Sequence, residues 1–282
     1  MQNKILKLRT PLRYPGGKAK ALTQILPHIK QHEEFREPFV GGGSVFIALE
    51  QLYAGKKFWI NDINFDLYCF WLILQKEPKR FVSKINEIKK EYLDGRLLYK
   101  IMLSEDYLGN EFDRAIRFFV LNRITFSGTT DSGGYSDQSF HNRFTQSSID
   151  RLTYYSDLLK NIKITNEDYE HSLFTEGDNV MIFLDPPYFS ATKSKLYGKN
   201  GDLHKGFDHQ RFSDSMRKCK HDWLITYDDS EYIRDLYKFA DIYEWQLQYG
   251  MTNYKKTFNR KGNELFITNY KLFNESLFLF DK

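Results

Sequence analysis

The sequence is poor in cysteine and histidine motifs. Its 282 residues include two cysteines, Cys69 and Cys219, which lie far apart in the chain and form no C-x-x-C pair. This excludes a disulfide framework and a cysteine-based metal site, and it indicates a reducing cytosol. No H-E-x-x-H motif is present, and we therefore predict that the protein holds no metal.

Long apolar runs are also missing. No stretch approaches the roughly 20 residues that a membrane-spanning helix needs, so we predict no membrane partner. Residues 1–6 lack the apolar segment of a secretory signal peptide, and the expected location is the cytoplasm. The chain has 41% hydrophobic and 17% aromatic residues, which predicts a packed core rather than global disorder. A net charge of +4 is compatible with a nucleic-acid partner without establishing one.

The most informative stretch is residues 180–189, in which the apolar run Val-Met-Ile-Phe-Leu is followed by Asp185-Pro-Pro-Tyr188. The run predicts a buried strand, and two prolines cannot continue its ladder. In an α/β sheet, ligands bind at the carboxyl ends of the strands. The sequence therefore predicts that Asp185, the Pro186 carbonyl and the Tyr188 ring lie at a binding site. Read alone, the segment also fits an ordinary strand end followed by a turn.

These three groups suit a planar base that carries an amino group. The exocyclic nitrogen of adenine is a poor nucleophile because its lone pair is delocalised into the ring. Two acceptors, the Asp185 carboxylate and the Pro186 carbonyl, can hold its two N–H groups and turn the lone pair toward an electrophile. Tyr188 can stack on the face of the base, an interaction of roughly 1–3 kcal/mol.

Two glycine-rich turns precede this stretch. Tyr14-Pro-Gly-Gly-Lys18 is followed by helical periodicity over residues 19–29, an arrangement that can bind an anion or can be an ordinary loop before a helix. In Glu37-Pro-Phe-Val-Gly-Gly-Gly43, a short strand passes into an apolar helix over residues 45–52. Asp62 ends a second strand, nineteen residues after Gly43. This spacing is typical of an acid that binds the ribose of an adenosine cofactor in a Rossmann-like sheet, although Asp62 can also cap the helix that follows.

Residues 75–150 are predicted to form an inserted, mainly helical lobe. It contains an amphipathic helix with a basic face over residues 79–100, a second helix over 112–123, and a polar glycine-rich loop over 127–136. Loops of this kind inside a compact domain are usually functional. Arginine and asparagine match the edges of guanine and adenine, and surface polarity is the alternative explanation. The candidate DNA-binding residues are Asn122, Arg123, Tyr135, Asn142 and Arg143.

The remaining strands are expected at residues 162–165, 223–227, 245–249 and 265–270, the last two forming an antiparallel hairpin. Asp168-Tyr169 follows one strand tip and can contact a ligand or cap the next helix. Basic residues are in excess over 193–220 and 255–261, which is compatible with contacts to DNA phosphates.

Taken in order, the four motifs Tyr14–Lys18, Glu37–Gly43, Asn61–Asn64 and Asp185–Tyr188 resemble the Dam-like DNA adenine N6-methyltransferases of the D12 class, alpha group. The resemblance runs from about residue 12 to residue 270. It implies a Rossmann-like α/β sheet, S-adenosyl-L-methionine as cofactor and a lobe that recognises double-stranded DNA. The cofactor-binding residues that follow from the turns and the resemblance are Tyr14, Lys18, Pro38, Phe39, Gly41, Gly43, Asp62 and Asp185.

The predicted reaction is direct methyl transfer to an adenine flipped out of the duplex, with Asp185, Pro186 and Tyr188 as the catalytic set. Residues 1–74 and 151–282 would form the catalytic domain, and the enzyme is expected to be a monomer. Cytosine N4-methylation, an RNA adenine substrate and a non-catalytic DNA-binding module of the same fold are the alternatives. The recognition sequence, GATC or another, and a separately encoded partner restriction endonuclease are left open.

Overall fold

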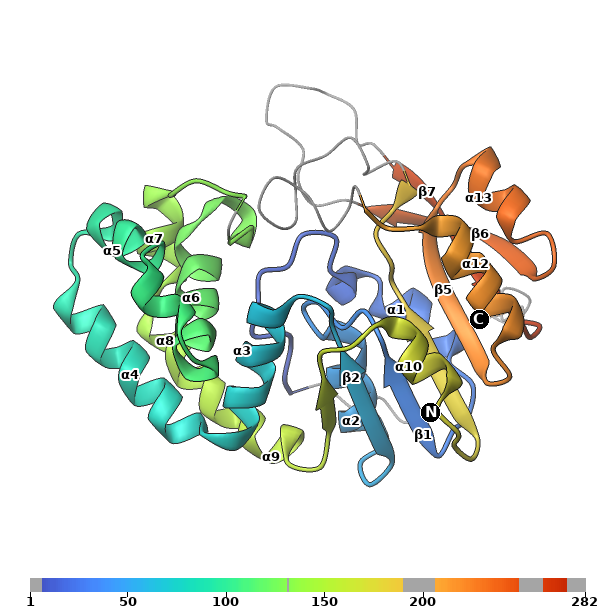
Figure 1. Cartoon of the computed structure of the whole chain (residues 1–282), viewed down its shortest axis with the longest axis horizontal. Helices are drawn as coiled ribbons and strands as arrows, with labels where there is room; N and C mark the ends of the chain where they lie inside the picture. Colours follow the sequence, from blue (N-terminus) through green and yellow to red (C-terminus); the bar gives the residue numbers. More distant parts are fainter. Residues whose placement is uncertain (1–6, 131, 190–205, 249–260, 273–282) are drawn as a thin grey trace, which may run out of the picture.

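A seven-stranded sheet with the order β3-β2-β1-β4-β5-β7-β6 forms the centre of the structure (Figure 1). The coordinates are a computed structural model that describes residues 7–130, 132–189, 206–248 and 261–272. The first five strands of this order pair in parallel, and β7 runs antiparallel between β5 and β6. The strands are β1 Glu34–Glu37, β2 Lys57–Asn61, β3 Lys163–Thr165, β4 Val180–Leu184, β5 Asp222–Asp228, β6 Asp241–Gln248 and β7 Lys261–Thr268.

Every predicted strand is present, and the terminal antiparallel hairpin is confirmed over its described residues. Because β1 pairs with β2 on one side and with β4 on the other, the chain reverses its direction of winding between β1 and β4. Such a switch point is where α/β sheets bind their ligands. The sheet therefore brings the end of the Glu37 strand beside the end of the Asp185 strand.

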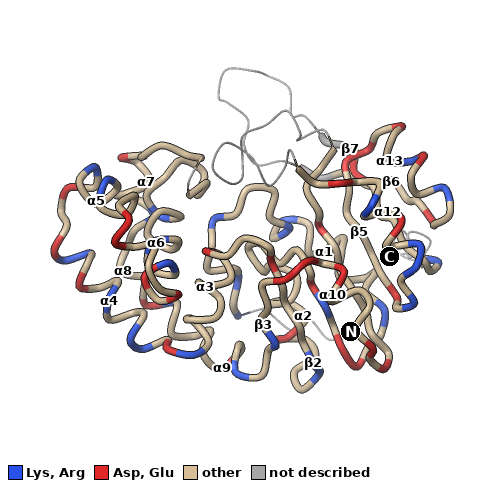
Figure 2. The backbone as a smooth tube through the Cα atoms, viewed as in Figure 1, with Lys and Arg blue, Asp and Glu red and all other residues tan. Residues whose placement is uncertain are grey.

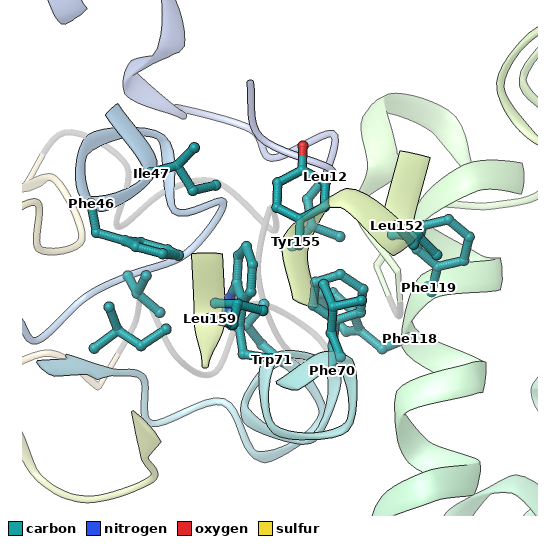
Figure 3. Close-up of a cluster of buried hydrophobic side chains, with 14 of the residues drawn as sticks. Leu12, Phe46, Ile47, Phe70, Trp71, Phe118, Phe119, Leu152, Tyr155 and Leu159 are labelled. Carbon is teal, nitrogen blue, oxygen red and sulfur yellow. The ribbon is translucent and has the colours of Figure 1, made fainter. Parts of the chain in front are cut away.

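Side chains that alternate along β4 build two hydrophobic cores, one on each face of the sheet. Met181 and Phe183 face a core shared with helices α2, α3 and α6, whereas Ile182 and Leu184 face a core shared with α10, α12 and α13. The first core continues into the helical lobe: Figure 3 shows Phe46 and Trp71 in the same cluster as Phe119. The lobe is thus packed onto the sheet domain through buried aromatic side chains.

The helices are α1 Leu22–Ile25, α2 Ser44–Leu52, α3 Phe65–Lys76, α4 Pro78–Glu91, α5 Gly95–Met102, α6 Glu111–Ile124, α7 Asp137–Arg143, α8 Gln146–Asp150, α9 Tyr155–Leu159, α10 Tyr169–Phe174, α12 His209–Lys218 and α13 Glu231–Leu236. Helices α4 to α8 lie together at one side of the sheet, on the left in Figure 1. Within this lobe, α6 packs against α3, α4, α5 and α7.

Three sequence expectations about helices need correction. The helix predicted over residues 79–100 is two helices, because Asp94 caps a new one by accepting from the N–H groups of Arg96 and Leu97. The periodic segment 19–29 is a series of short α and 3₁₀ turns interrupted at Pro27. The cap of α3 is Asn64, whose side chain accepts from the N–H groups of Asp66 and Leu67, and Asp62 does not cap the helix.

The polar loop that follows α6 has more structure than its composition indicates. Thr125 pairs with Tyr135 in an isolated antiparallel bridge, and a 3₁₀ turn spans Phe126–Gly128. Asp131 lies outside the described residues. None of the helices that the structure describes is long and apolar enough to cross a membrane. In the same residues, no group of three or more metal-ligating side chains could hold an ion.

Candidate active site

Asp185 is the centre of the site. It directly follows β4, and its side chain is 20% exposed. The Lys18 ammonium donates to both carboxylate oxygens at 2.7 Å, and the Thr226 hydroxyl donates to Oδ1 at 2.8 Å. Lys18 is itself almost fully buried, so this is a desolvated ion pair with short, charge-assisted hydrogen bonds. The fold thus joins the first glycine turn to the D-P-P-Y motif.

Tyr188 is held from two sides. Its hydroxyl donates to Glu264 Oε2 at 2.8 Å, and the Lys18 ammonium lies 5.0 Å from the centre of its ring. Glu264 is on β7 and is 1% exposed. Pro186 is buried, and among the described residues no hydrogen bond uses its carbonyl oxygen. The ring is therefore fixed at the strand end while the adjacent carbonyl keeps its acceptor capacity.

Sequence reasoning missed Thr226 and Glu264. Thr226 lies on β5, which neighbours β4 in the sheet, and Glu264 lies on β7, the next strand beyond β5; each touches a catalytic candidate. Thr226 belongs to a predicted strand but is one polar residue in an apolar run. Glu264 would have been detectable only as a carboxylate at the start of a predicted core strand. Both are fully buried, and a buried polar side chain in a central strand is the signal that could have found them.

The second glycine turn packs closely under Tyr14. Gly41 has φ +45°, and a Cβ there would lie 2.8 Å from the Tyr14 ring. Gly43 has φ +70°, and its Cβ would lie 2.3 Å from the Phe46 ring. The turn is also fixed by Asp62, whose Oδ2 accepts from the Gly41 N–H at 3.0 Å. Glycine is required here because both the backbone conformation and the space exclude a side chain.

Acidic side chains outnumber basic ones around this turn. Glu37 is 3% exposed, accepts from the Phe46 N–H at 2.9 Å, and lies near Asp185 and Asp62. Burial raises the pKa of Glu37 well above its usual range, and the neighbouring carboxylates raise it further. Burial also raises the pKa of Asp62 to about 6, against the opposing effect of the N–H groups of Asn64 and Gly41. Lys18 is the cation paired with this cluster, so the site favours an additional positive charge.

A cavity of about 250 Å³ opens beside the turn, between the ends of β1, β2 and β3. Three aromatic side chains contribute to its walls: the Phe39 ring lies 5.6 Å from Tyr169 and 5.7 Å from Phe207. Ile63 is 56% exposed at its edge. The residues lining the cavity are Pro38, Phe39, Asn61, Ile63, Glu167, Asp168, Tyr169, Gly206, Phe207, Asp208 and Arg211.

Several predicted cofactor residues therefore meet in one place. Pro38 and Phe39 line the cavity, and Asn61 ties Pro38 to the β3 end by donating to the carbonyls of Pro38 and Glu167. Asp168 both caps α10 and pairs with Arg211 at 3.0 Å. The expectation that Asp168 caps the next helix is thus confirmed, and its carboxylate also lies on the wall of the cavity.

The DNA-binding candidates lie in two environments. Asn142 and Arg143 are exposed at the end of α7, and Tyr135 is half-buried under Arg96. Asn122 is fully buried: its amide donates to the carbonyls of Arg13 and Gly128, and its oxygen accepts from the Arg13 N–H. This placement does not fit a contact with a base edge, because the whole amide is used to hold the loop. Arg123 is also buried, with 5% of its surface exposed.

The sheet order, with its inserted antiparallel β7, and the acidic strand end with D-P-P-Y define the class as a Rossmann-like methyltransferase. The chain belongs to the family of D12 class N6 adenine-specific DNA methyltransferases, whose family model matches residues 14–251. The expected fold class, family and activity are thereby confirmed. The activity of the family is methylation of adenine at N6 in DNA.

Named relatives agree with this assignment. The type II methyltransferase M1.LlaDCHI of Lactococcus lactis subsp. cremoris is 25% identical over 96% of this chain and 98% of its own length. The type II methyltransferase M.MjaIII of Methanocaldococcus jannaschii is 26% identical over 68% of this chain and 73% of its own length. A DNA adenine methylase of Vibrio cholerae is 25% identical over 84% and 87%, respectively.

Proposed function

We propose that the chain transfers a methyl group from S-adenosyl-L-methionine to N6 of an adenine flipped out of double-stranded DNA. Asp185, the Pro186 carbonyl and Tyr188 hold the base at the end of β4. The observation that carries this proposal is the Asp185 carboxylate, fixed by Lys18 and Thr226 at the sheet's switch point beside the Pro186 carbonyl, which accepts no hydrogen bond from the described residues.

The hydrogen bonds of Asp185 indicate which oxygen receives the amino group. A carboxylate offers about four lone-pair sites, two on each oxygen. Among the described residues, Oδ1 accepts from both Lys18 and Thr226, whereas Oδ2 accepts from Lys18 alone. Oδ2 therefore has a free site for one N6–H, and the Pro186 carbonyl has room for the other. Holding both hydrogens lets N6 pyramidalise, so positioning and dipole orientation supply the catalysis.

Tyr188 would stack on the flipped base. Its ring can hold one orientation because its hydroxyl is bonded to Glu264 and its face lies near Lys18. A base that leaves the duplex loses stacking of a few kcal/mol, and a prearranged aromatic surface repays part of this cost. Asp185 need not be a strong base, because N6 becomes acidic once it is methylated.

The residues around the glycine turn fit the cofactor. When bound, S-adenosyl-L-methionine supplies an electrophilic methyl group on a positively charged sulfur. The carboxylates of Asp62 and Asp185, with Lys18 beside Asp185, favour such a cation. Because Gly41 and Gly43 have no Cβ, the Tyr14 and Phe46 rings can pack against the turn. Asp62 retains acceptor sites for ribose hydroxyls, and the aromatic cavity suits an adenine ring.

Residues 75–150 are proposed to recognise the DNA, and residues 1–74 and 151–282 to carry out the chemistry. Exposed polar side chains on α7, including Asn142 and Arg143, support the first assignment. The names of two relatives as type II methyltransferases favour a restriction-modification setting with a separately encoded endonuclease.

The test is to incubate the protein with S-adenosyl-L-methionine and unmethylated genomic DNA, digest the DNA to nucleosides and identify the product by mass spectrometry. N6-methyl-deoxyadenosine is expected, and single-molecule sequencing of the same DNA then gives the recognition sequence. N4-methyl-deoxycytidine would contradict the base assignment. A parallel reaction with structured RNA should give no product.

Cofactor binding is expected to weaken below about pH 6. The raised pKa of Asp62, about 6, means that its carboxyl is protonated in more acidic solution and ionised above that pH. Ribose hydroxyls donate to the ionised form, so affinity should fall about tenfold between pH 7 and pH 5. Calorimetric titration of the DNA-free protein with S-adenosyl-L-methionine across this range measures the effect.

Asp62→Asn is the matched control for this pH dependence, because the amide keeps the shape and does not titrate. It should bind the cofactor more weakly at neutral pH and show a flat profile between pH 5 and pH 7. An undiminished pH dependence in Asp62→Asn would assign the titration to Glu37 instead, whose pKa is also raised by burial.

A further inference from the structure

Arg123 is a buried cation without an anionic partner. It lies in the last turn of α6, 5% exposed, with its guanidinium 5.2 Å from the centre of the Phe119 ring. Its Nε has no hydrogen-bond partner, and the described residues provide no ion pair for it. An unpaired buried charge is costly, because desolvation is not offset by an opposite charge.

The other buried arginines show what a purely structural arginine looks like in this chain. Arg36 pairs with Glu34 at 2.6 Å and donates to three backbone carbonyls. Arg117 pairs with Asp66 at 2.6 Å and donates to the carbonyl of Met102 at 3.0 Å. Both are fully compensated within the protein, and Arg123 is not.

More positive charge surrounds Arg123. Burial lowers the pKa of its guanidinium to about 9, and the nearby cations Arg13, Arg151 and Arg143 lower it further. Arg13 comes from the segment before the first glycine turn, and its Nη1 donates to the Thr125 carbonyl and to Ser139 Oγ. Arg143 and Arg151 are exposed, one at the end of α7 and one after α8. None of these four arginines makes an ion pair with a described carboxylate.

Four neighbouring arginines from four segments, none of which forms an ion pair with a described carboxylate, have the composition of an anion site. We propose that Arg13, Arg123, Arg143 and Arg151 together bind one phosphodiester group of the DNA backbone. This deepens the proposed function, since it rests on DNA being the substrate. Arg123 supplies a fixed charge, and the exposed Arg143 and Arg151 can close over the phosphate.

This proposal changes the role expected for Arg123 and Arg143. A guanidinium that is 5% exposed cannot enter a groove to contact a base edge, but it can face a phosphate that approaches the surface. The site also lies where the lobe meets the catalytic domain, because Arg13 is bonded to Thr125 and directly precedes Tyr14. A phosphate bound there would fix the position of the duplex relative to both the lobe and the catalytic domain.

The experiment compares Arg123→Met with Arg80→Met in DNA binding without cofactor. Arg80 is an exposed arginine of the same lobe, and it is paired with Glu77. Affinity for duplexes of several sequences is measured by fluorescence anisotropy between 50 and 300 mM salt. The loss of one phosphate contact should reduce the slope of log K against log salt concentration by about 1, and affinity about eightfold near 0.1 M salt.

Arg123→Met should weaken binding equally for every DNA sequence, whereas Arg80→Met should leave the affinity unchanged. The melting temperature of the Arg123→Met protein should equal or exceed that of the wild type. A salt slope equal to that of the wild type, or a loss confined to one DNA sequence, would overturn the proposal. If Arg123→Met does not fold, the double variant Arg143→Met/Arg151→Met, at two exposed positions, gives the same test and should reduce the slope by up to about 2.

The outcome is independent of the catalytic assignment. If the wild-type enzyme forms N6-methyl-deoxyadenosine while the arginine variants keep its salt slope, the phosphate site fails and the proposed function stands. If no methylated base forms but the slopes change as expected, the proposed function fails and the anion site is supported.

Discussion

Replacing Asp185 by asparagine is expected to lower the rate of methyl transfer by about 10²–10³-fold while the chain stays folded. Asparagine retains one oxygen for Thr226, but it removes the charge that pairs with Lys18 and replaces one oxygen with an NH₂ group. That group donates instead of accepting, so it repels an N6–H and leaves the buried lysine unpaired. Single-turnover rates with radiolabelled cofactor measure the loss directly.

Asp178→Asn is the matched control for Asp185→Asn. Asp178 is exposed and lies just before β4, at the opposite end of the same strand. The Asp178→Asn variant should methylate DNA at the wild-type rate. Calorimetric titration of Asp185→Asn with the cofactor then separates a chemical defect from a binding defect. A near-normal rate in Asp185→Asn with the cofactor bound would refute the assigned role.

The parts of the fold that depend on local patterns were predictable from the sequence. Apolar runs bounded by glycine, proline and acidic residues predicted the strands, and the spacing between Gly43 and Asp62 predicted a Rossmann-like sheet with an acid at the end of its second strand. In the structure, the Asp62 carboxylate accepts a hydrogen bond from the Gly41 N–H, so this acid contacts the glycine turn directly. Such positions can be recognised in the sequence because the backbone conformation of a turn or strand end restricts which residues can occupy it.

Contacts between distant residues were not predictable in the same way. Lys18 and Asp185 are separated by 167 positions, and Tyr188 and Glu264 by 76. The family resemblance placed both Lys18 and Asp185 at the cofactor, and in the structure the Lys18 ammonium pairs with the Asp185 carboxylate. Strand order decides such contacts, because β4 lies between β1 and β5 only once the sheet has assembled.

Burial of polar residues was the main source of error in the lobe. Asn122 and Arg123 come at the end of an aromatic helix and precede a polar loop, so their composition indicates a surface. Instead, the Asn122 amide closes hydrogen bonds to the segment before the first glycine turn. Figure 2 shows that Lys and Arg are distributed over most elements of the structure. Their positions in the sequence therefore do not indicate which face of the protein binds DNA. Charge counts indicate a partner class but not a binding surface.

Arg36 is the position where a single substitution is expected to cost most stability. Its side chain is 1% exposed inside the sheet domain, where it pairs with Glu34 and lies 5.1 Å from the centre of the Trp59 ring. Its guanidinium also donates to the carbonyls of Ser172, Thr175 and Glu176 at 2.7–3.0 Å, at and just after the end of helix α10. One side chain thus donates to three carbonyls at a helix end, where His221 also contacts the Thr175 carbonyl and the Cys219 thiol donates to the Leu173 carbonyl.

Arg36→Met should therefore lower the free energy of unfolding by about 3–5 kcal/mol, because the Glu34 carboxylate and three carbonyls, one of them buried, lose a charged donor. Urea unfolding followed by tryptophan fluorescence measures this loss. Arg234→Met is the control. Arg234 pairs with two acids, Asp229 and Glu244, but its side chain is 38% exposed, so this substitution should cost less than about 1 kcal/mol of stability.

The Arg36 variant also separates stability from catalysis. Arg36 contacts the last turn of α10, whereas the cavity is lined by Asp168 and Tyr169 at its first turn. The rate per folded molecule should therefore remain near that of the wild type at temperatures where Arg36→Met is folded. Equal stability of Arg36→Met and the wild type would mean that these carbonyls find other donors. A large loss of rate in folded protein would mean that α10 transmits the change along its length to the cofactor cavity.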